Sequence, residues 1–275
     1  MEELTLNEIQ KASLGVLLKF HEICEKHNLT YYLAYGTLIG AVRHGGFIPW
    51  DDDIDVWMPR DDFDRFKVIC NEENMYPYKL CTRSNTKNYT YYIPRFANME
   101  YKYVTTSKNV KDFDIGVFLD IYPLDNYPSE EKKEKLFKKI DKINRNYTIY
   151  VNGRSSSNVL KTFFKILIHF ALRLAHNNHY SSNVDNKIDK LIKANTISND
   201  KLGMYAWEST IDGKYAYKKE YFNNKMLMKF EEYKFWVPKE YDEILKYYYG
   251  NYMKLPPENE RVPYHNYKIY KREDM

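Results

Sequence analysis

The sequence predicts an α+β fold, in which a mixed β-sheet is flanked by helices and carries a helical insertion. Apolar residues recur at intervals of three and four in some segments and form short β-branched and aromatic runs in others, so helices and strands share one chain. Residues 129–200 instead hold two helical patterns separated by a loop. With 275 residues, 44% hydrophobic and 29% charged, the chain suits a single domain whose core comprises about 1–128 and 201–275.

A long amphipathic helix and a strand are predicted first. Thr5 and Glu8 fit a capping box, in which each side chain bonds the backbone N–H of the other residue. After them, apolar residues repeat at three and four as far as Cys24, which predicts a helix with one buried face. "LTYYLAY" (29–35) follows and is typical of a strand.

A turn, a short helix, a strand and another helix are predicted next. Gly36 and Thr37 form the turn, and "LIGAVRH" begins a helix that the following Gly-Gly ends. "DIDVWM" (53–58) is the strand, and Asp61 or Asp62 caps the helix after it.

The remaining elements complete the sheet and form the insertion. Strands are predicted at 79–82, 89–97 and 116–122, and "KFWVP" predicts another strand near the C-terminus. Within the insertion, "SEEKKEKLFKKIDKINR" is a charged helix and "VLKTFFKILIHFALRLA" (159–175) a largely apolar one.

Composition excludes several classes of protein. The net charge of +4 is small and the charged residues are interspersed, which argues against a dedicated nucleic-acid binder. The three cysteines lie far apart without a C-x-x-C spacing and predict reduced thiols in a cytoplasmic protein. The polar N-terminus does not resemble a signal peptide, and no apolar run is long enough to predict a spanning helix.

The stretch "WDDDID" places four carboxylates in five positions, and their mutual repulsion needs an explanation. Side chains alternate along a strand, so Asp53 and Asp55 project to one side and together can bind Mg²⁺. Asp51 shares their parity and is a candidate auxiliary ligand, whereas Asp52 is expected to point the other way. A solvated acidic turn is the alternative. A calcium loop of the EF-hand type is disfavoured because its central Gly and final Glu are absent.

The residues before this strand predict a phosphate site. A turn at Gly36 and Thr37, between a strand and a helix, can present backbone N–H groups and a hydroxyl to a phosphate. Arg43 can hold a phosphate oxygen bidentately, or it can pair with a neighbouring aspartate. His44 is either a phosphate donor or a structural residue of the loop.

A third carboxylate is expected for two-metal phosphoryl chemistry. Asp120 in "GVFLDIYPLD" is the best candidate, because an unpaired carboxylate on an apolar strand would be destabilising. Asp125 is a weaker candidate that can instead cap a turn.

Four stretches of this chain make it similar to the LicD family, which is related to fukutin and fukutin-related protein. They are "YYLAYGTLIG", "GTLIGAVRHGGFIPWDDDID", "FLDIYPLD" and "FWVPKEYDEILKYYYGNYMKLPPE". The resemblance covers most of the chain and is weakest at 129–200. It implies a nucleotidyltransferase-like mixed sheet and transfer of a phospho-alcohol, usually phosphocholine from CDP-choline, with release of CMP. The implied acceptor is a sugar hydroxyl of a teichoic-acid or lipopolysaccharide precursor.

The motifs and the resemblance together imply a set of site residues. The expected metal is Mg²⁺, as one or two ions, with Mn²⁺ as an alternative. Its ligands are Asp53, Asp55 and Asp120, with Asp51 also in the motif. The residues expected to be catalytic are Asp53, Asp55, Asp120 and Arg43. Those expected to bind substrate are Gly36, Thr37, Arg43, His44 and His265, the last closing over the site from the C-terminal tail.

Other reactions remain open on the same motifs. The alcohol can be ribitol or glycerol, and a related enzyme would transfer a nucleotide and release pyrophosphate. A degenerate, non-catalytic nucleotide-binding module is a third reading. Choline itself would require an aromatic cage. Tyrosine and tryptophan are plentiful, and the candidates for the cage are Tyr91, Tyr92, Trp207, Trp236 and Tyr264.

The apolar helix of the insertion predicts contact with a membrane surface. Lys161, Lys165, His169 and Arg173 form one basic stripe at a spacing of four. Its 17 residues span about 25 Å, short of the roughly 30 Å hydrocarbon core, so a helix lying flat is favoured over a spanning one. Packing into the core is the alternative. We therefore expect a cytoplasmic protein that contacts the inner membrane face through 159–175 and meets a lipid-linked glycan acceptor there.

Overall fold

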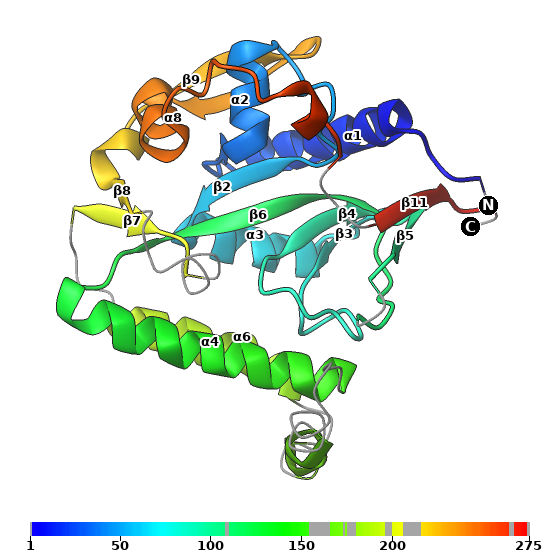
Figure 1. The fold of residues 1–275 in the computed structure, drawn as a ribbon, viewed down its shortest axis with the longest axis vertical. Helices are drawn as coiled ribbons and strands as arrows, with labels where there is room; N and C mark the ends of the chain where they lie inside the picture. Colours follow the sequence, from blue (N-terminus) through cyan, green and yellow to red (C-terminus); the bar gives the residue numbers. More distant parts are fainter. Residues whose placement is uncertain are drawn as a thin grey trace.

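The predicted α+β class is confirmed by a computed structural model of the chain. It describes residues 2–107, 110–153, 166–172, 174, 180–195, 200–205, 216–263 and 267–273. Helices lie above and below a central mixed sheet, and the N- and C-terminal segments meet at one edge of the molecule (Figure 1).

The central sheet has one parallel pair, and that pair positions the site. The strands run in the order β1 (Tyr32–Leu33), β2 (Asp55–Pro59), β6 (Val117–Asn126), β4 (Arg95–Asn98) and β3 (Tyr78–Cys81). Two short strands, β7 (Lys201–Gly203) and β8 (Tyr217–Lys218), extend the sheet from the end of β6. Strands β2 and β6 are parallel and the other pairs are antiparallel. The register sets Asp55 directly opposite Asp120.

Three helices from the first part of the chain pack around these strands. They are α1 (Leu6–Lys26), α2 (Tyr35–Arg43) and α3 (Arg60–Glu72). The predicted capping box at the start of α1 is present, with the Thr5 hydroxyl accepting from the Glu8 backbone N–H. The apolar face of α1 packs on β6 and β4, α3 packs on β2, β3 and β6, and α2 contacts β2.

Several predicted boundaries are wrong because tertiary pairing, rather than local propensity, decides them. Of the strand predicted at 29–35, only β1 pairs, and of 89–97 only the residues from Arg95 onward join the sheet. The helix α3 begins with Pro59 as its N-cap. Asp61 and Asp62 therefore lie in its first turn, where carboxylates favour the helix dipole.

The C-terminal part of the chain packs on α2 and on the edge strand β1 of the central sheet. The hairpin of β9 (Lys225–Phe230) and β10 (Tyr233–Pro238), which includes the predicted "KFWVP" strand, packs on α2 and β1, and α8 (Tyr241–Tyr249) also contacts α2. Strands β5 (Tyr101–Thr105) and β11 (Tyr267–Lys271) form a separate pair. The short 3-10 helices are η1 (Lys219–Phe222) and η2 (Glu258–Glu260).

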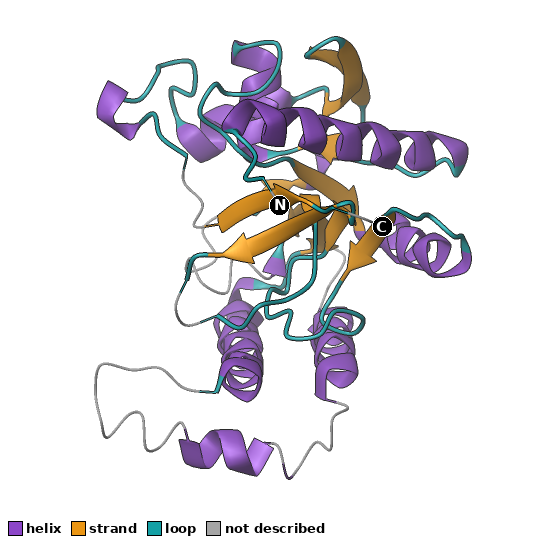
Figure 2. Ribbon diagram, turned by 90° about the vertical axis from the view of Figure 1, so that its right-hand side faces the viewer, coloured by secondary structure: helices purple, strands orange, loops and turns teal. Residues whose placement is uncertain are grey.

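The inserted helices α4 (Glu130–Asn152) and α6 (Tyr180–Asn195) pack on each other beneath the sheet (Figure 1). They share a second hydrophobic cluster that includes Ile140, Tyr147 and Ile188 and is distinct from the main core. A short helical segment at 166–172 lies at the end of this pair farthest from the sheet (Figure 2). Among the described residues, the structure contains no helix that is both long and apolar enough to cross a membrane.

Candidate active site

Three carboxylates converge where β2 and β6 lie side by side. Asp53, Asp55 and Asp120 each place one oxygen within 4.8 Å of the other two. Asp55 and Asp120 are buried, and Asp53 is partly exposed. Parallel pairing makes this possible, because it brings residues 65 positions apart in the sequence into register. The oxygen-only donor set suits a hard cation such as Mg²⁺ or Mn²⁺.

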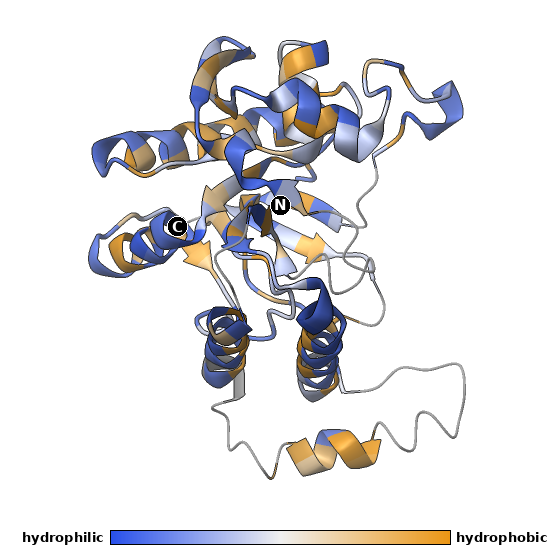
Figure 3. Cartoon of the chain, turned by 90° about the vertical axis from the view of Figure 1, so that its left-hand side faces the viewer, coloured by the Kyte–Doolittle hydropathy of each residue, from blue (hydrophilic) through white to orange (hydrophobic). Residues whose placement is uncertain are grey.

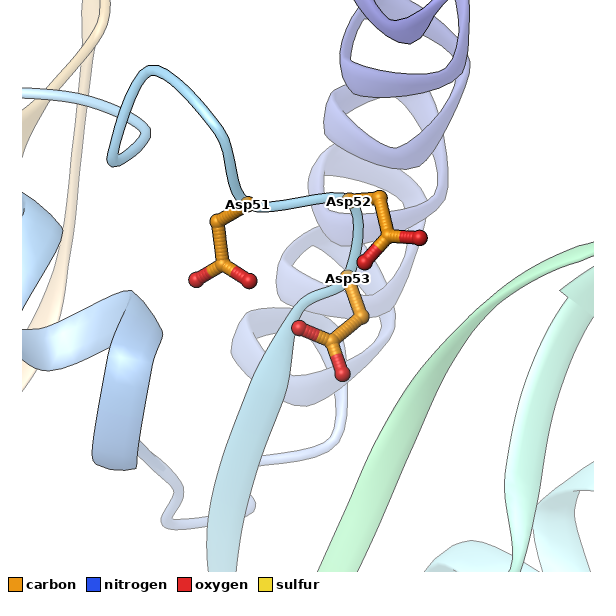
Figure 4. Close-up of side chains that lie close together, drawn as sticks. All are labelled: Asp51, Asp52 and Asp53. Atoms are coloured by element: carbon orange, nitrogen blue, oxygen red, sulfur yellow. The ribbon is translucent and has the colours of Figure 1, made fainter. Parts of the chain in front are cut away.

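A second acidic group leads into the first. Oxygens of Asp51, Asp52 and Asp53 also lie within 4.8 Å of one another, at the entrance to β2 (Figure 4). The prediction that Asp52 points away from its neighbours is therefore wrong. The physical reason is that β2 begins only at Asp55, so the alternation of a strand does not extend back to residues 51–54.

Gly36 allows Asp51 to approach the start of α2. A Cβ atom at position 36 would lie 2.7 Å from Asp51 Oδ2, so any side chain there would displace the carboxylate. The N-cap residue Ala34 makes no side-chain cap hydrogen bond, so the Asp51 carboxylate is the acidic side chain placed next to the first turn of α2. A carboxylate at this position is favoured by the positive end of the helix dipole.

Thr37 connects the helix to the carboxylate strand. It lies in the first turn of α2 rather than in a turn before the helix, and its Oγ1 accepts a 2.8 Å hydrogen bond from the Asp55 backbone N–H. This bond fixes the backbone of Asp55 relative to α2. The hydroxyl proton is still available to a further acceptor.

The carboxylates strain one another electrostatically. Burial, followed by the charges of Asp53, Asp120 and Asp51, raises the pKa of Asp55 well above its usual range, although the Tyr122 hydroxyl opposes this by donating to it. Asp55 Oδ1 is buried and has no hydrogen-bond partner among the described residues. A buried carboxylate oxygen in this state is destabilising unless a proton or a cation compensates it, so the site fits a divalent metal.

Arg95 is a site residue that the sequence did not reveal. Its Nε donates to Asp120 Oδ1 at 2.7 Å, and its guanidinium lies 3.9 Å from the ring centroid of Phe118 and 4.5 Å from that of Tyr91. Its Nη1 is buried without a hydrogen-bond partner among the described residues. One feature of the sequence could have identified it: Arg95 stands within the apolar segment "PRFAN", and a buried arginine needs a counter-charge.

Arg43 and His44 lie at the other end of α2 from Gly36. Arg43 Nε donates to His44 Nε2 at 2.9 Å, and its Nη1 donates to the Tyr252 carbonyl oxygen at 2.8 Å. Arg43 lies seven residues, or about 10 Å of helix, beyond Gly36. The prediction that Arg43 holds a phosphate therefore requires a donor that extends along this helix.

His265 and the five aromatic candidates for a choline cage remain to be placed. His265, Trp207 and Tyr264 lie outside the described residues. The other three candidates for a choline cage are described. Tyr91, Tyr92 and Trp236 already have a cation of the protein over the ring, at 4.5 Å for Arg95, 5.2 Å for Arg83 and 4.2 Å for Lys225.

Aspartates that meet where two parallel strands lie side by side, next to the start of a helix, are typical of enzymes that act on phosphate groups. Comparison with known proteins refines this class. The family described as "LicD/FKTN/FKRP, nucleotidyltransferase domain" matches residues 28–151, which include α2, β2 and β6. The chain is also 34% identical over 276 residues to the lipopolysaccharide cholinephosphotransferase LicD of Haemophilus influenzae, covering 98% of this chain and 99% of that protein.

Shorter similarities extend to two uncharacterized proteins. One, from Rickettsia typhi, is 38% identical over 76 residues, which is 27% of this chain and 25% of that protein. The other, from Rickettsia prowazekii, is 50% identical over 51 residues, or 18% and 19% of the two chains. The match to the Haemophilus protein extends over almost the whole chain. The chain therefore belongs to the LicD family and is a phosphotransferase enzyme.

Proposed function

We propose that this enzyme transfers phosphocholine from CDP-choline to a sugar hydroxyl of a cell-surface glycan precursor and releases CMP. The observation that carries the proposal is the similarity, over nearly the full length of both chains, to a lipopolysaccharide cholinephosphotransferase. The cluster of Asp53, Asp55 and Asp120 supports it, because phosphoryl transfer depends mainly on positioning and on neutralising phosphate charge. A teichoic acid and a lipopolysaccharide are both acceptors of the proposed kind.

The proposed metal is Mg²⁺, as one or two ions, with Mn²⁺ as the alternative. Asp53, Asp55 and Asp120 would hold it, with Asp51 as an additional ligand. A metal bound there would supply positive charge to the donor phosphates and to the departing CMP. The unpartnered Asp55 Oδ1 supports this assignment.

The residues of the chain perform the remaining tasks. The first turn of α2, at Gly36 and Thr37, would bind the pyrophosphate through its backbone N–H groups. Arg95 fixes the orientation of Asp120. The acceptor hydroxyl oxygen then attacks the phosphorus that carries choline, the bond from this phosphorus to the CMP oxygen breaks, and Asp120 accepts the hydroxyl proton.

Product analysis tests the proposal. The purified enzyme is incubated with Mg²⁺ and CDP-choline, CDP-ribitol or CDP-glycerol, with and without a glycolipid acceptor, and CMP is quantified. We expect CMP from CDP-choline, more of it with acceptor, and none after chelation of the metal or in Asp53→Asn. CMP from only CDP-ribitol or CDP-glycerol would contradict the choice of choline. Pyrophosphate released from a nucleoside triphosphate, without CMP from any donor, would replace the proposal by nucleotide transfer.

A second part of the proposal places the enzyme on the inner face of the cell membrane, where a lipid-linked acceptor lies. Residues 166–172 are helical and expose apolar side chains, including Leu167 at 50% and Phe170 at 64% (Figure 3). The His169 Nδ1 atom lies 3.0 Å from the Ile149 carbonyl oxygen, which ties this segment to α4. The other members of the basic stripe, Lys161, Lys165 and Arg173, lie outside the described residues.

Charge is distributed unevenly in a way that supports a membrane contact. Residues 129–200 contain 14 Lys and Arg but only 7 Asp and Glu, a net +7, whereas the rest of the chain contains 28 against 31. Basic side chains next to exposed apolar ones favour the surface of an anionic membrane.

Flotation with anionic liposomes tests this contact. We expect the wild type to float with the liposomes and Leu167→Asp/Phe170→Asp to remain with the soluble fraction. Val68→Asp is the matched control, because Val68 lies on helix α3 and is also 50% exposed. Equal flotation of all three proteins, or loss of flotation in the control as well, would contradict a contact through 166–172.

A further inference from the structure

We propose that Tyr248 and Tyr249, with Tyr35 behind them, form the binding site for the quaternary ammonium group of the donor. This inference rests on the proposed function, in which the donor carries choline. A quaternary ammonium has no N–H to donate, so proteins bind it with the faces of aromatic rings and with nearby negative charge. We therefore expect the ammonium group to bind at aromatic rings that lie close to the carboxylates.

Four tyrosines form a continuous path from the carboxylates to the surface. The Tyr122 hydroxyl bonds to Asp55, and the Tyr122 and Tyr35 ring centroids are 5.0 Å apart. The Tyr248 ring follows at 5.5 Å from Tyr35, and Tyr249 lies 4.6 Å from Tyr248. These residues come from β6, α2 and α8, which meet because α8 packs against α2 (Figure 1).

The outer end of this path reaches the surface of the molecule. Tyr35 and Tyr122 are buried, Tyr248 is partly buried and Tyr249 is 40% exposed. The planes of the Tyr248 and Tyr249 rings are inclined at 54° to each other. The rings of these two neighbouring residues together offer aromatic surface of the kind that binds a quaternary ammonium. The rings of Tyr91, Tyr92 and Trp236 each have a cation of the protein over them, so they are weaker candidates for binding a second cation.

The surrounding charge also favours a cation at these rings. Burial, then Tyr248 and Tyr35, then the carboxylates of Asp55 and Asp51, raise the pKa of the Tyr249 hydroxyl. The hydroxyl end of Tyr249 is therefore within electrostatic reach of both aspartates. A donor whose phosphates lie at the carboxylate cluster would then place its alcohol toward α8, and a positive alcohol is favoured over a neutral one.

Paired binding measurements test the site. Isothermal titration compares CDP-choline with CDP, which lacks the choline, for the wild type, Tyr249→Leu, Tyr248→Leu and the two Phe variants. Loss of one cation–ring contact is expected to weaken CDP-choline binding by about 3- to 30-fold in the Leu variants. CDP affinity should be unchanged, which also shows that the variants are folded, and Phe should retain the binding because it keeps the ring. Tyr233→Leu is the matched control, since Tyr233 is 43% exposed but lies on β10.

The outcomes separate this inference from the proposed function. If the wild type releases CMP from CDP-choline but the Leu variants bind it normally, or lose CDP and CDP-choline equally, the tyrosine site is wrong and the function stands. If the wild type uses only CDP-ribitol or CDP-glycerol, the choice of choline fails and the tyrosine site fails with it.

Discussion

Strand β6 carries two buried aspartates, Asp120 and Asp125, and their surroundings differ in one respect. Asp125 receives both arms of Arg60, with bonds of 2.8 and 2.6 Å from Nε and Nη2. Asp120 receives one bond, from Arg95 Nε, and shares its surroundings with the carboxylates of Asp53 and Asp55. Asp125 is therefore paired through both of its oxygens with the Arg60 guanidinium. Asp120 instead belongs to a group of three carboxylates and accepts a single bond from Arg95.

The Asp125 end of β6, which we call the balanced end because its buried charges are paired, joins the insertion to the core. The Asp120 end is called the unbalanced end. Arg60 of α3 also lies 3.8 Å from Asp189, and Arg83, which follows β3, lies 3.4 Å from Asp185. Ion pairs therefore join these parts of the core to α6. Arg60, Asp125, Asp185 and Asp189 line a cavity of about 260 Å³. Pairing of this kind compensates burial within the protein itself. At the Asp120 end three carboxylates lie together, and Asp55 Oδ1 has no hydrogen-bond partner among the described residues. A proton or a bound cation would compensate this buried oxygen, so we expect the Asp120 end, and not the Asp125 end, to be functional.

The largest effect is expected at the unbalanced end. Asp53→Asn or Asp55→Asn should lower kcat/KM by about 10³-fold or more, because each removes charge stabilisation of the transferred phosphate. Asp55→Asn should at the same time stabilise the metal-free protein by about 1 kcal/mol, since it removes a buried carboxyl whose ionised form is disfavoured by burial and by the neighbouring carboxylates. Activity assays and urea unfolding measure the two effects. Retained activity, or a protein destabilised by the substitution, would argue against a functional cluster.

At the balanced end, breaking the pair should affect stability. Arg60→Met leaves Asp125 buried without its bidentate partner, and we expect a loss of about 3–5 kcal/mol in the free energy of unfolding. The double variant Arg60→Met/Asp125→Leu should recover part of this loss, because no buried charge is left unpaired. Urea unfolding measures both. A single variant as stable as the wild type would show that the pairing does not hold this region together.

Arg95 should have a smaller effect, on turnover. Arg95→Met frees Asp120 from its only described charged partner, and loss of such a positioning contact is expected to lower kcat about 10- to 100-fold, with Arg95→Lys partly restoring it. Arg83→Met is the matched control, since Arg83 is also buried against tyrosine rings but lies among the residues of the balanced end. Similar losses of kcat per folded molecule in both Met variants would mean that Arg95 acts only on the fold.

The smallest effect concerns the pH dependence of stability. Burial, against the opposing charge of Arg83, raises the pKa of Asp185 to about 6. Because the pKa of Asp185 is higher in the folded state than in the unfolded state, protonation of Asp185 stabilises the folded protein. This contribution to the free energy of unfolding is complete below about pH 4 and is lost as the pH rises through 6. The free energy of unfolding should therefore decline between about pH 4 and 7. Asp185→Asn should remove roughly 1–3 kcal/mol of that decline, as measured by urea unfolding. An unchanged pH profile would show that Asp185 titrates normally.

Local patterns in the sequence determined much of this protein. The capping box of α1, the α+β class and the acidic stretch before β2 are all properties of neighbouring residues, and their periodicity or chemistry is visible without a partner. For the same reason Asp53, Asp55 and Asp120 were identifiable as candidates, since carboxylates on apolar strands need an explanation wherever they lie.

The tertiary structure decided which of these residues meet. Parallel pairing of β2 with β6 places Asp120 opposite Asp55, β4 brings Arg95 to Asp120, and α8 brings Tyr248 to Tyr35. Strand register and helix packing are set by contacts between segments far apart in the chain, and the local periodicity of any one segment does not specify its partner. The carboxylates could therefore be read from the sequence, whereas the arginine and the tyrosines around them required the fold.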